Sequence, residues 1–465
     1  MVVHDDAKTH LTSHRFLGRL GLPPPGIRRY IRRVALPLIL LLACGLRLLV
    51  ALNIPLDPAT QYHYDATWYD TTARSLARGW GFAGAHGAPV VKWPPGYPLL
   101  LSALYKFTSE PILNAKLLNV LMATATCFLT FAIGRRAYGV SIGLVAALLL
   151  AASPGDIFYA PIGLSEVMFQ LAFTLLVYTF LVFDRSAVGI AGGRWLLLGL
   201  FTGATALIRG PGLFFLPVPI AAWWLASVPR RRVLVRGLLL LAGLAIALTP
   251  WAIRNQRTFG SPILISTNGS WVLFDSHSPV ATGAHTKQAG RYRKAQFADL
   301  LELPRRQRIA EASRQEIRAA VRFAISHPVE ELILAPQRLY HLFAGDDFAV
   351  GLSQRAFEQP DGRLSRRLNM KFTGLSMLAN VYFAILTVLA LLGFTRVWSR
   401  ASRHAVAIPF AVLVFVLMHT FVLIGGMRFH VPFVPLLAIL AAVGLDGRRR
   451  PWPLREATCA GKQYP

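Results

Sequence analysis

Residues 34–52 read VALPLILLLACGLRLLVAL, a run that is apolar almost throughout. A transmembrane helix needs about 20 predominantly apolar residues, so this stretch predicts a membrane span. The residues before it are polar and basic, and no small-residue cleavage pattern follows it. The run is therefore expected to be a retained anchor rather than a cleaved signal peptide.

Further apolar stretches follow along the chain and predict a polytopic protein. Of its 465 residues, 54% are hydrophobic and only 15% are charged, whereas soluble domains average about 25% charged residues. Three cysteines exclude a disulfide scaffold. The expected fold class is an all-α polytopic membrane protein of about 10–12 transmembrane helices, with helices in its extracytoplasmic loops. The candidate spans after the first are 112–133, 139–154, 163–183, 195–208, 211–228, 234–251, 374–396, 404–424 and 428–445.

The net charge of +27 would indicate nucleic acid as a partner for a soluble protein. In a membrane protein, cytoplasmic loops carry an excess of lysine and arginine, which explains the charge without a nucleic-acid partner. Orientation depends on the apolar run 96–107, which is too short to cross comfortably and reads as an interfacial helix. With that run at the surface, the basic loops fall on the cytoplasmic side, and both termini are expected to be cytoplasmic.

This topology divides the chain into five regions. They are a cytoplasmic basic arm (1–33), an N-terminal transmembrane bundle (34–251) that includes the first outer loop (53–111), an extracytoplasmic loop region (252–373), C-terminal transmembrane helices (374–446) and a cytoplasmic tail (447–465). In the long loop region, a helix is expected at about 305–326, ended by His327-Pro328. A second, at about 329–344, is expected on the membrane surface.

Five ionisable residues fall on the outer side in this topology, and each has an ordinary alternative explanation. Asp65 would lie in the first turn of a short helix at 65–78, where it can act as a general base or merely cap the helix. Glu166 begins a long apolar run, where it can face a polar cavity or cap the helix. Lys92, before Pro94-Pro95, can neutralise a lipid phosphate or simply snorkel.

Arg209 and Arg428 are the lone cations of two short outer turns. Guanidinium groups fork onto phosphate oxygens and stay charged in apolar surroundings, although isolated exceptions to the loop-charge rule are also common. Together with Asp65, Glu166 and Lys92 they indicate a site that positions a lipid-linked phosphate and activates an acceptor. No Cys/His spacing typical of a metal site occurs, and no metal or cofactor is expected.

The order of these motifs resembles the GT-C membrane glycosyltransferases, specifically the dolichyl-phosphate-mannose–protein mannosyltransferase and lipid A aminoarabinose transferase group. The resemblance covers about 34–445. Its elements are Tyr64-Asp65, Lys92-Trp93-Pro94-Pro95-Gly96-Tyr97-Pro98, Ser165-Glu166, Pro250-Trp251-Ala252-Ile253-Arg254-Asn255, Ser266-Thr267-Asn268-Gly269 and Met427-Arg428-Phe429. Two positions depart from the family pattern, because Glu166 stands where Asp is usual and Trp93 separates Lys92 from the proline pair.

The resemblance implies inverting transfer of a sugar from a polyprenyl-monophosphate carrier to an extracytoplasmic acceptor, without a metal, in a bacterial plasma membrane. It implies catalytic roles for Asp65 and Glu166 and binding of the donor phosphate by Lys92, Arg428 and Arg209. Arg254, Asn255 and Tyr64 would lie at the rim. A ligase that uses a diphosphate-linked donor and a transporter without chemistry stay open as alternatives.

Overall fold

The computed structural model describes residues 25–55, 64–85, 87–185, 192–357, 364–400 and 406–447. The predicted arm up to residue 24 and the tail from residue 448 lie outside these described residues. Within them the chain is helical, without a β-sheet; two isolated β-bridges join Ala83 to Pro89 and Ala284 to Gly425. The predicted all-α polytopic membrane fold is confirmed.

Every predicted span coincides with a helix or with a 3₁₀ segment continued by a helix. The helices of this set are α1 (Pro25–Asn53), α4 (Pro111–Tyr138), α5 (Val140–Ala151), α7 (Glu166–Arg185), α8 (Gly193–Ala206), η1 with α9 (Gly210–Phe215, Pro217–Leu225), α10 (Arg230–Phe259), α16 (Arg366–Arg400), α17 (Ala407–Phe421) and η3 with α18 (Val431–Phe433, Val434–Leu445). Five of them, α1, α4, α7, α10 and α16, are long and apolar enough to cross a membrane by themselves.

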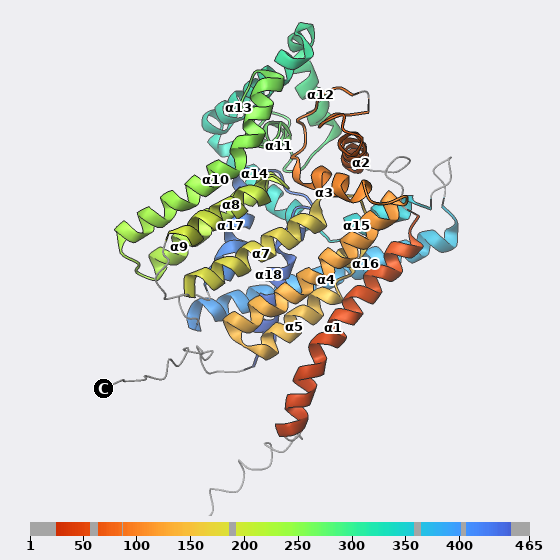
Figure 1. Ribbon diagram of the computed structural model, residues 1–465, viewed down its shortest axis with the longest axis vertical. Coiled ribbons are helices and arrows are strands. Elements are labelled where there is room, and N and C mark those ends of the chain that lie inside the picture. The colour runs from red at the N-terminus through yellow and green to blue at the C-terminus, as the bar shows by residue number, and fades with distance from the viewer. Residues whose placement is uncertain are drawn as a thin grey trace, which may run out of the picture.

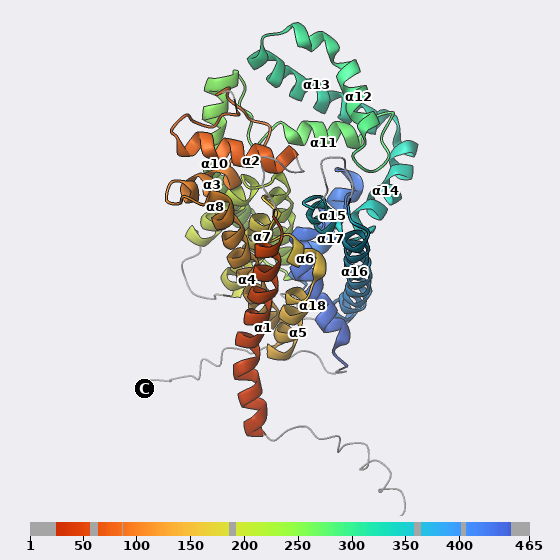
Figure 2. The same ribbon diagram turned by 90° about the vertical axis from the view of Figure 1, so that its right-hand side faces the viewer.

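The remaining helices gather mainly at one end of this bundle (Figures 1 and 2). They are α2 (Tyr64–Ala77), α3 (Gly96–Tyr105), α6 (Pro154–Phe158), α11 (Asn268–Ser276), α12 (Lys287–Gln296), η2 (Ala298–Glu302), α13 (Arg305–Ser326), α14 (Pro328–Phe343) and α15 (Phe348–Arg355). With ten residues, α3 is about 15 Å long, half the hydrocarbon thickness of a bilayer. It packs beside α2 and is too short to cross.

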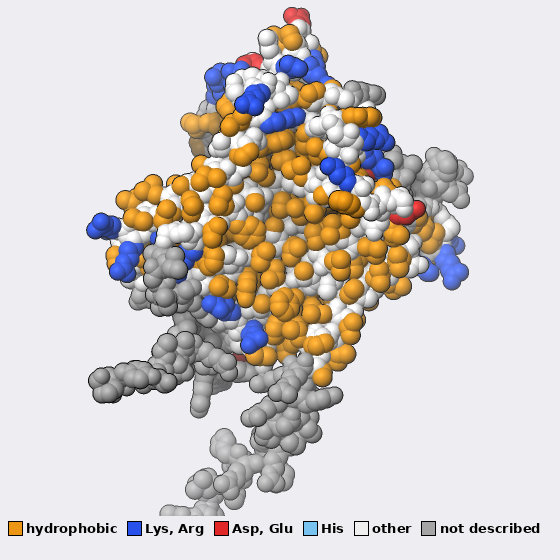
Figure 3. All heavy atoms as spheres, viewed as in Figure 1, with side chains coloured by type: hydrophobic (Ala, Val, Ile, Leu, Met, Phe, Trp, Pro, Cys, Tyr) orange, Lys and Arg blue, Asp and Glu red, His pale blue; other side chains and the backbone are white. Residues whose placement is uncertain are grey.

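The bundle is built around α18, whose residues from Val434 to Gly444 are all buried. A helix that is apolar on every side belongs in the interior, and α18 packs against α16, α5 and α4. By contrast, α1, α10 and α16 expose much of their apolar surface. Figure 3 shows the result, a broad hydrophobic surface across the middle of the molecule with basic side chains toward its two ends.

Glycines set how closely the outer helices approach. Gly199 of α8 and Gly243 of α10 face each other's helix, and a Cβ on either would lie 2.0 Å from a backbone oxygen of the partner, Leu240 or Leu196. Small residues allow this backbone contact, which drives helix association in lipid where the hydrophobic effect between helices is absent. The contact fixes α10 against the body of the bundle.

Several helices extend beyond the predicted limits of their spans: α1 begins at Pro25 rather than at 34, inside the predicted basic arm, and α4 ends at Tyr138 rather than at 133. The end of α10 reaches Phe259, two turns past residue 251, and α16 begins at Arg366 rather than at 374. The extensions of α10 and α16 are not apolar enough to be recognised as parts of a span. They are helical because backbone hydrogen bonding continues after the chain leaves the hydrocarbon region. As a result α10 carries Arg254 and Asn255 up to the layer of α2 and α11.

Candidate active site

Asp65, Glu166, Arg209 and Arg428 come together in one ion-pair cluster. Arg428 lies between the two carboxylates, with NH1 2.8 Å from Oδ2 of Asp65 and Nε 3.7 Å from Oε1 of Glu166. The same Oε1 atom lies 2.6 Å from NH1 of Arg209. Four segments that are far apart in the sequence therefore supply one contiguous set of charges, which we call the charge cluster.

Three of the four members of the charge cluster lie at or next to the start of a helix. Asp65 occupies the first turn of α2, and Glu166 is the first residue of α7. The unsatisfied N–H groups and positive dipole of a helix start favour a carboxylate at both positions. Arg209 is the extended residue before η1, and Arg428 belongs to the connection between α17 and η3. The helix ends thus bring charge to the boundary of the bundle.

Hydrogen bonds tie these helix starts together. NH1 of Arg209 donates to Oγ of Ser165 at 3.2 Å, and that hydroxyl lies 3.2 Å from the phenol oxygen of Tyr69 on α2. The N–H of Gly96, at the start of α3, donates to the carbonyl of Leu207 at 2.8 Å. The Pro94-Pro95 element is thereby fixed beside the Arg209 turn.

The charge cluster is shielded but not sealed. The side chain of Glu166 is 1% exposed, while those of Arg209 and Arg428 are 14% and 16% exposed. Burial opposes the charge of Arg428, but Asp65 and Glu166 outweigh it and raise its pKa. Guanidinium groups tolerate such sites because they are weakly hydrated and stay protonated. The two arginines offer the solvent-accessible edge of the cluster.

Tyr159 is a further member that the sequence did not single out. Its ring is buried, and burial raises the pKa of its phenol, with Glu166 and Asp346 adding to the effect and Arg428 and Arg209 opposing it. The phenol oxygen makes no hydrogen bond with another described residue. Tyr159 lies six residues before Ser165 in the sequence, but only the folded chain shows that it interacts electrostatically with the cluster.

Lys92 lies beside the charge cluster rather than in it. Its Nζ is 4.7 Å from the ring centre of Trp271 and 5.2 Å from that of Trp93. Burial lowers the pKa of Lys92, and Arg293 lowers it further, while the negative charge of Asp65 works in the opposite direction. Lys92 therefore interacts electrostatically with Asp65 on one side and with a group of residues that includes Arg293 on the other.

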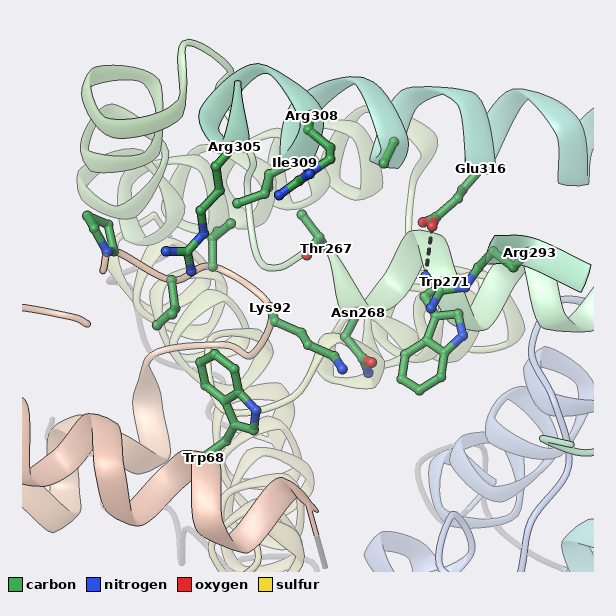
Figure 4. Close-up of a pocket in the computed structure, with 14 residues that line it drawn as sticks. Trp68, Lys92, Thr267, Asn268, Trp271, Arg293, Arg305, Arg308, Ile309 and Glu316 are labelled. Carbon is green, nitrogen blue, oxygen red and sulfur yellow. Dashed lines mark hydrogen bonds and ion pairs between the residues drawn. The ribbon is translucent and has the colours of Figure 1, made fainter. Parts of the chain in front are cut away.

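Those residues line a cavity of about 280 Å³, which we call the upper cavity (Figure 4). The segment 89–92, the start of α11, and helices α12 and α13 supply its walls, with Trp68 of α2 at its base. The N–H groups of Thr267 and Asn268 donate to the carbonyls of Val91 and Lys92, both at 3.1 Å. These two bonds fix the start of α11 to the Lys92 segment.

The predicted rim residues mostly hold the backbone. Arg254 donates from NH1 to the carbonyl of Val90 and from NH2 to that of Phe82, both at 2.9 Å. Asn255 donates from Nδ2 to the carbonyl of Ile263 at 2.6 Å. Arg254 and Asn255 thus fix the segments on either side of the upper cavity. Tyr64 is the first residue of α2, and its side chain lies outside the described residues.

The upper cavity also contains residues that sequence reasoning missed. Trp271 follows the quoted Ser266-Thr267-Asn268-Gly269 motif by two residues, so the motif's position was a usable signal. Arg293 and Glu316 lie in the polar helices α12 and α13, where charged side chains are ordinarily solvated, and nothing in the sequence distinguished them. Among the described residues, no group of three His, Cys, Asp or Glu side chains is placed to hold a metal.

Residues 92–253 match the family dolichyl-phosphate-mannose-protein mannosyltransferase. This segment includes Lys92, Glu166 and Arg209 of the predicted site. No curated protein sequence matches the chain.

Among solved structures, the chain is similar to the archaeal oligosaccharyltransferase AglB from Archaeoglobus fulgidus in complex with an inhibitory peptide and a dolichol-phosphate. The identity is 16%, the TM-score is 0.51, and the match covers 90% of this chain and 50% of that one. ArnT from Cupriavidus metallidurans bound to undecaprenyl phosphate matches at 13% identity and a TM-score of 0.38, over 90% of this chain and 78% of that one. The chain spans half the length of the oligosaccharyltransferase. The predicted resemblance to GT-C glycosyltransferases is confirmed at the level of fold.

Proposed function

We propose that this protein is a membrane glycosyltransferase that moves a sugar from a polyprenyl-monophosphate carrier to an extracytoplasmic acceptor. The observation that carries the proposal is the charge cluster, in which Asp65 and Glu166 share Arg428 at the membrane boundary of the bundle. A transferase for lipid-linked sugars needs cations for the lipid phosphate and a base for the acceptor at one place. The partial family match and the shared fold support the same activity.

Asp65 is the residue that suits the base. Its carboxylate accepts from Arg428 at 2.8 Å, so a cation lies against it in the cluster. A donor phosphate that binds Arg428 competes for these N–H groups, and Asp65 then loses part of its cationic partner. Its affinity for a proton rises as a consequence. Donor binding would thus prepare the base that takes the acceptor proton.

Glu166 is better suited to holding the two arginines than to moving protons. It is almost fully buried, and its Oε1 atom lies near both Arg209 and Arg428. A buried carboxylate with two guanidinium partners has its charge balanced within the site. We therefore assign Glu166 a positioning role, with Arg209 and Arg428 presented toward the donor phosphate.

The chemical step is a single displacement. A hydroxyl or amine of the acceptor attacks the anomeric carbon of the sugar, and its proton passes to Asp65. The bond between the anomeric carbon and the phosphate oxygen breaks, and polyprenyl monophosphate leaves with the bonding electrons. Arg428 and Lys92 stabilise the charge that develops on that oxygen. Attack opposite the leaving group inverts the configuration, and the step as written needs no metal.

The test is donor consumption by the purified chain in membranes that supply their natural acceptors. Radiolabelled polyprenyl-monophosphate sugars and matched diphosphate-linked sugars are offered separately, with and without EDTA. The proposal predicts that label leaves the monophosphate carrier only when the chain is present, with and without EDTA. Consumption of the diphosphate-linked donor alone would instead identify a ligase. Movement of intact donor across the bilayer without loss of label would identify a transporter.

A further inference from the structure

The upper cavity is chemically distinct from the charge cluster beneath it. Its walls come from α11, α12 and α13, beyond the end of the membrane-spanning bundle (Figures 2 and 4). Its volume of about 280 Å³ is just below the range for drug-sized ligand sites, roughly 300–1,000 Å³. A cavity of this size and position suits a compact polar ligand that reaches the site from the aqueous side.

The walls of the upper cavity carry an excess of positive charge. Four cations line it, Lys92, Arg293, Arg305 and Arg308, against the single carboxylate of Glu316. That carboxylate is engaged, since Arg293 NH1 donates to its Oε1 at 2.9 Å and Ser270 Oγ to its Oε2 at 2.7 Å. Among the described residues, no carboxylate lies within 4.0 Å of Arg305 or Arg308. The excess charge favours an anionic ligand.

One tryptophan gathers two of these cations. The ring of Trp271 lies 4.7 Å from Nζ of Lys92 and 4.9 Å from Cζ of Arg293. Attraction between the cations and the ring holds two like charges near each other, where an anion would relieve their repulsion. The arrangement therefore prepares this wall for a negative group.

Neutral polar groups of the same wall are available as well. The indole N–H of Trp271 and the Oδ1 atom of Asn268 are shielded from solvent and make no hydrogen bond with another described residue. A shielded donor or acceptor without a partner is unfavourable, so a ligand that satisfies both gains affinity. One donor and one acceptor side by side match the hydroxyl groups of a sugar.

The cavity is also connected to the proposed base. Trp68, at the base of the cavity, follows Asp65 by one turn of α2, and residues three apart on a helix share a face. Lys92 lines the cavity and interacts electrostatically with Asp65. A ligand held by the upper cations can therefore direct a hydroxyl group toward Asp65.

We infer that the upper cavity binds the acceptor, and that this acceptor is an anionic sugar, carrying a phosphate or carboxylate group. The inference rests on the proposed function, which it extends by naming the chemical class of the acceptor. Arg305 and Arg308 bind the anionic group, Asn268 and Trp271 bind hydroxyl groups, and the reacting hydroxyl points to Asp65. The donor phosphate binds at Arg428 and Arg209, and Lys92, which lines the cavity and interacts with Asp65, lies between the two sites.

The test measures binding to the purified full chain in nanodiscs in the absence of donor. Glucose 6-phosphate and glucose serve as probes in ligand-observed NMR titrations. Glucose 6-phosphate is expected to bind at least tenfold more tightly than glucose. The R305Q/R308Q double variant should lose this preference. R306Q is the matched control, because Arg306 is exposed on the same turn of α13 and does not line the cavity.

Three results would overturn the inference: equal binding of both probes, an unchanged preference in R305Q/R308Q, or competitive displacement of glucose 6-phosphate by polyprenyl monophosphate. The last result would place the donor phosphate in the upper cavity. Donor consumption, measured in parallel, separates the two proposals. A chain that consumes donor but binds both probes equally keeps the transferase and loses the anionic acceptor. A chain that prefers glucose 6-phosphate but consumes no donor loses the transferase.

Discussion

Asp65 and Arg428, from opposite ends of the chain, form an ion pair with 2.8 Å between Oδ2 and NH1. Asp65 enters it from the first turn of α2 and Arg428 from the connection before η3. The pair joins the layer of α2 and α3 to the last helices of the bundle. It therefore has a structural consequence and, in the proposed reaction, a chemical one, and these can be separated by experiment.

Exchanging the two charged residues separates the structural role of the pair from its chemical role. D65R and R428D each leave a mostly buried charge without its partner, which costs about 3 kcal/mol. The D65R/R428D double variant restores an ion pair between positions 65 and 428 but leaves Glu166 facing a second carboxylate, so its thermal unfolding temperature in detergent should recover part of the loss. Transfer should not recover, because the base and the phosphate ligand have changed places. Recovery of transfer together with stability would show that the pair is only structural.

Glu166 offers a test of positioning against proton transfer. E166Q removes the charge that holds Arg209 and Arg428, so the KM for the donor should rise several-fold as the two arginines lose their orientation. E166D keeps the charge and should restore most of the donor affinity. The pH profile of the maximal rate should be the same in all three proteins. A profile displaced in E166Q would instead mark Glu166 as a group that exchanges protons in the reaction.

The lowered pKa of Lys92 should make the affinity for the donor depend on pH. Because burial and Arg293 lower its pKa, Lys92 loses its proton at a lower pH than an ordinary lysine. Donor affinity that depends on this cation should then decline as pH rises through the lowered pKa. K92R carries a guanidinium that stays protonated, so its alkaline limb should move to higher pH. K106R, at an exposed lysine, is the control, and an identical alkaline limb in K92R and wild type would contradict the account.

Removal of the Arg254 side chain should disorder the backbone segment that leads to Lys92. It donates to the carbonyls of Phe82 and Val90, so R254A should increase amide hydrogen exchange in the segment that leads to Lys92. R254K should not restore protection, since a single ammonium cannot reproduce the planar fork of donors. Unchanged exchange between residues 82 and 92 in R254A would remove its positioning role.

The close contact between α8 and α10 should not tolerate a larger residue at its glycines. A Cβ at Gly199 would lie 2.0 Å from the carbonyl oxygen of Leu240, whereas a Cβ at Gly237 of α10 would meet nothing within 4 Å. G199A should therefore force the helices apart and lower the thermal unfolding temperature. G237A is the matched control and should leave it unchanged. Equal unfolding temperatures for the two variants would mean that the helices do not pack through these glycines.

The sequence predicted the helices well where local signals were strong. The helix predicted at about 305–326 has these limits in the structure, and His327-Pro328 was the signal for its end. The runs of apolar residues located the bundle for a similar reason. Helix ends in the boundary layer were missed, since the continuation of α10 to Phe259 is polar and looks like a loop.

The candidate site was predictable in membership but not in pairing. Sidedness placed Asp65, Glu166, Arg209 and Arg428 together, and the structure brings them into one cluster. No sequence rule, however, indicates that Glu166 contacts both arginines, because these contacts depend on how α7, η1 and α17 pack. The upper cavity was not predicted, since Arg293, Arg305 and Arg308 look like solvated residues until α11 and α13 fold over Lys92.

In the proposed reaction Asp65 removes a proton from the acceptor, and one paired comparison of variants tests this role most directly. Asp70 lies on the same helix but pairs with Arg74 at 2.7 Å and accepts from Tyr105 at 2.9 Å, outside the charge cluster. Sugar transfer from the polyprenyl-monophosphate donor is measured with D65N and D70N, both confirmed as folded by their thermal unfolding. Loss of a general base typically costs about 10²–10⁴-fold in rate, so D65N should fall by at least about 100-fold while D70N stays within several-fold of wild type. Transfer by folded D65N at the wild-type rate would contradict the account.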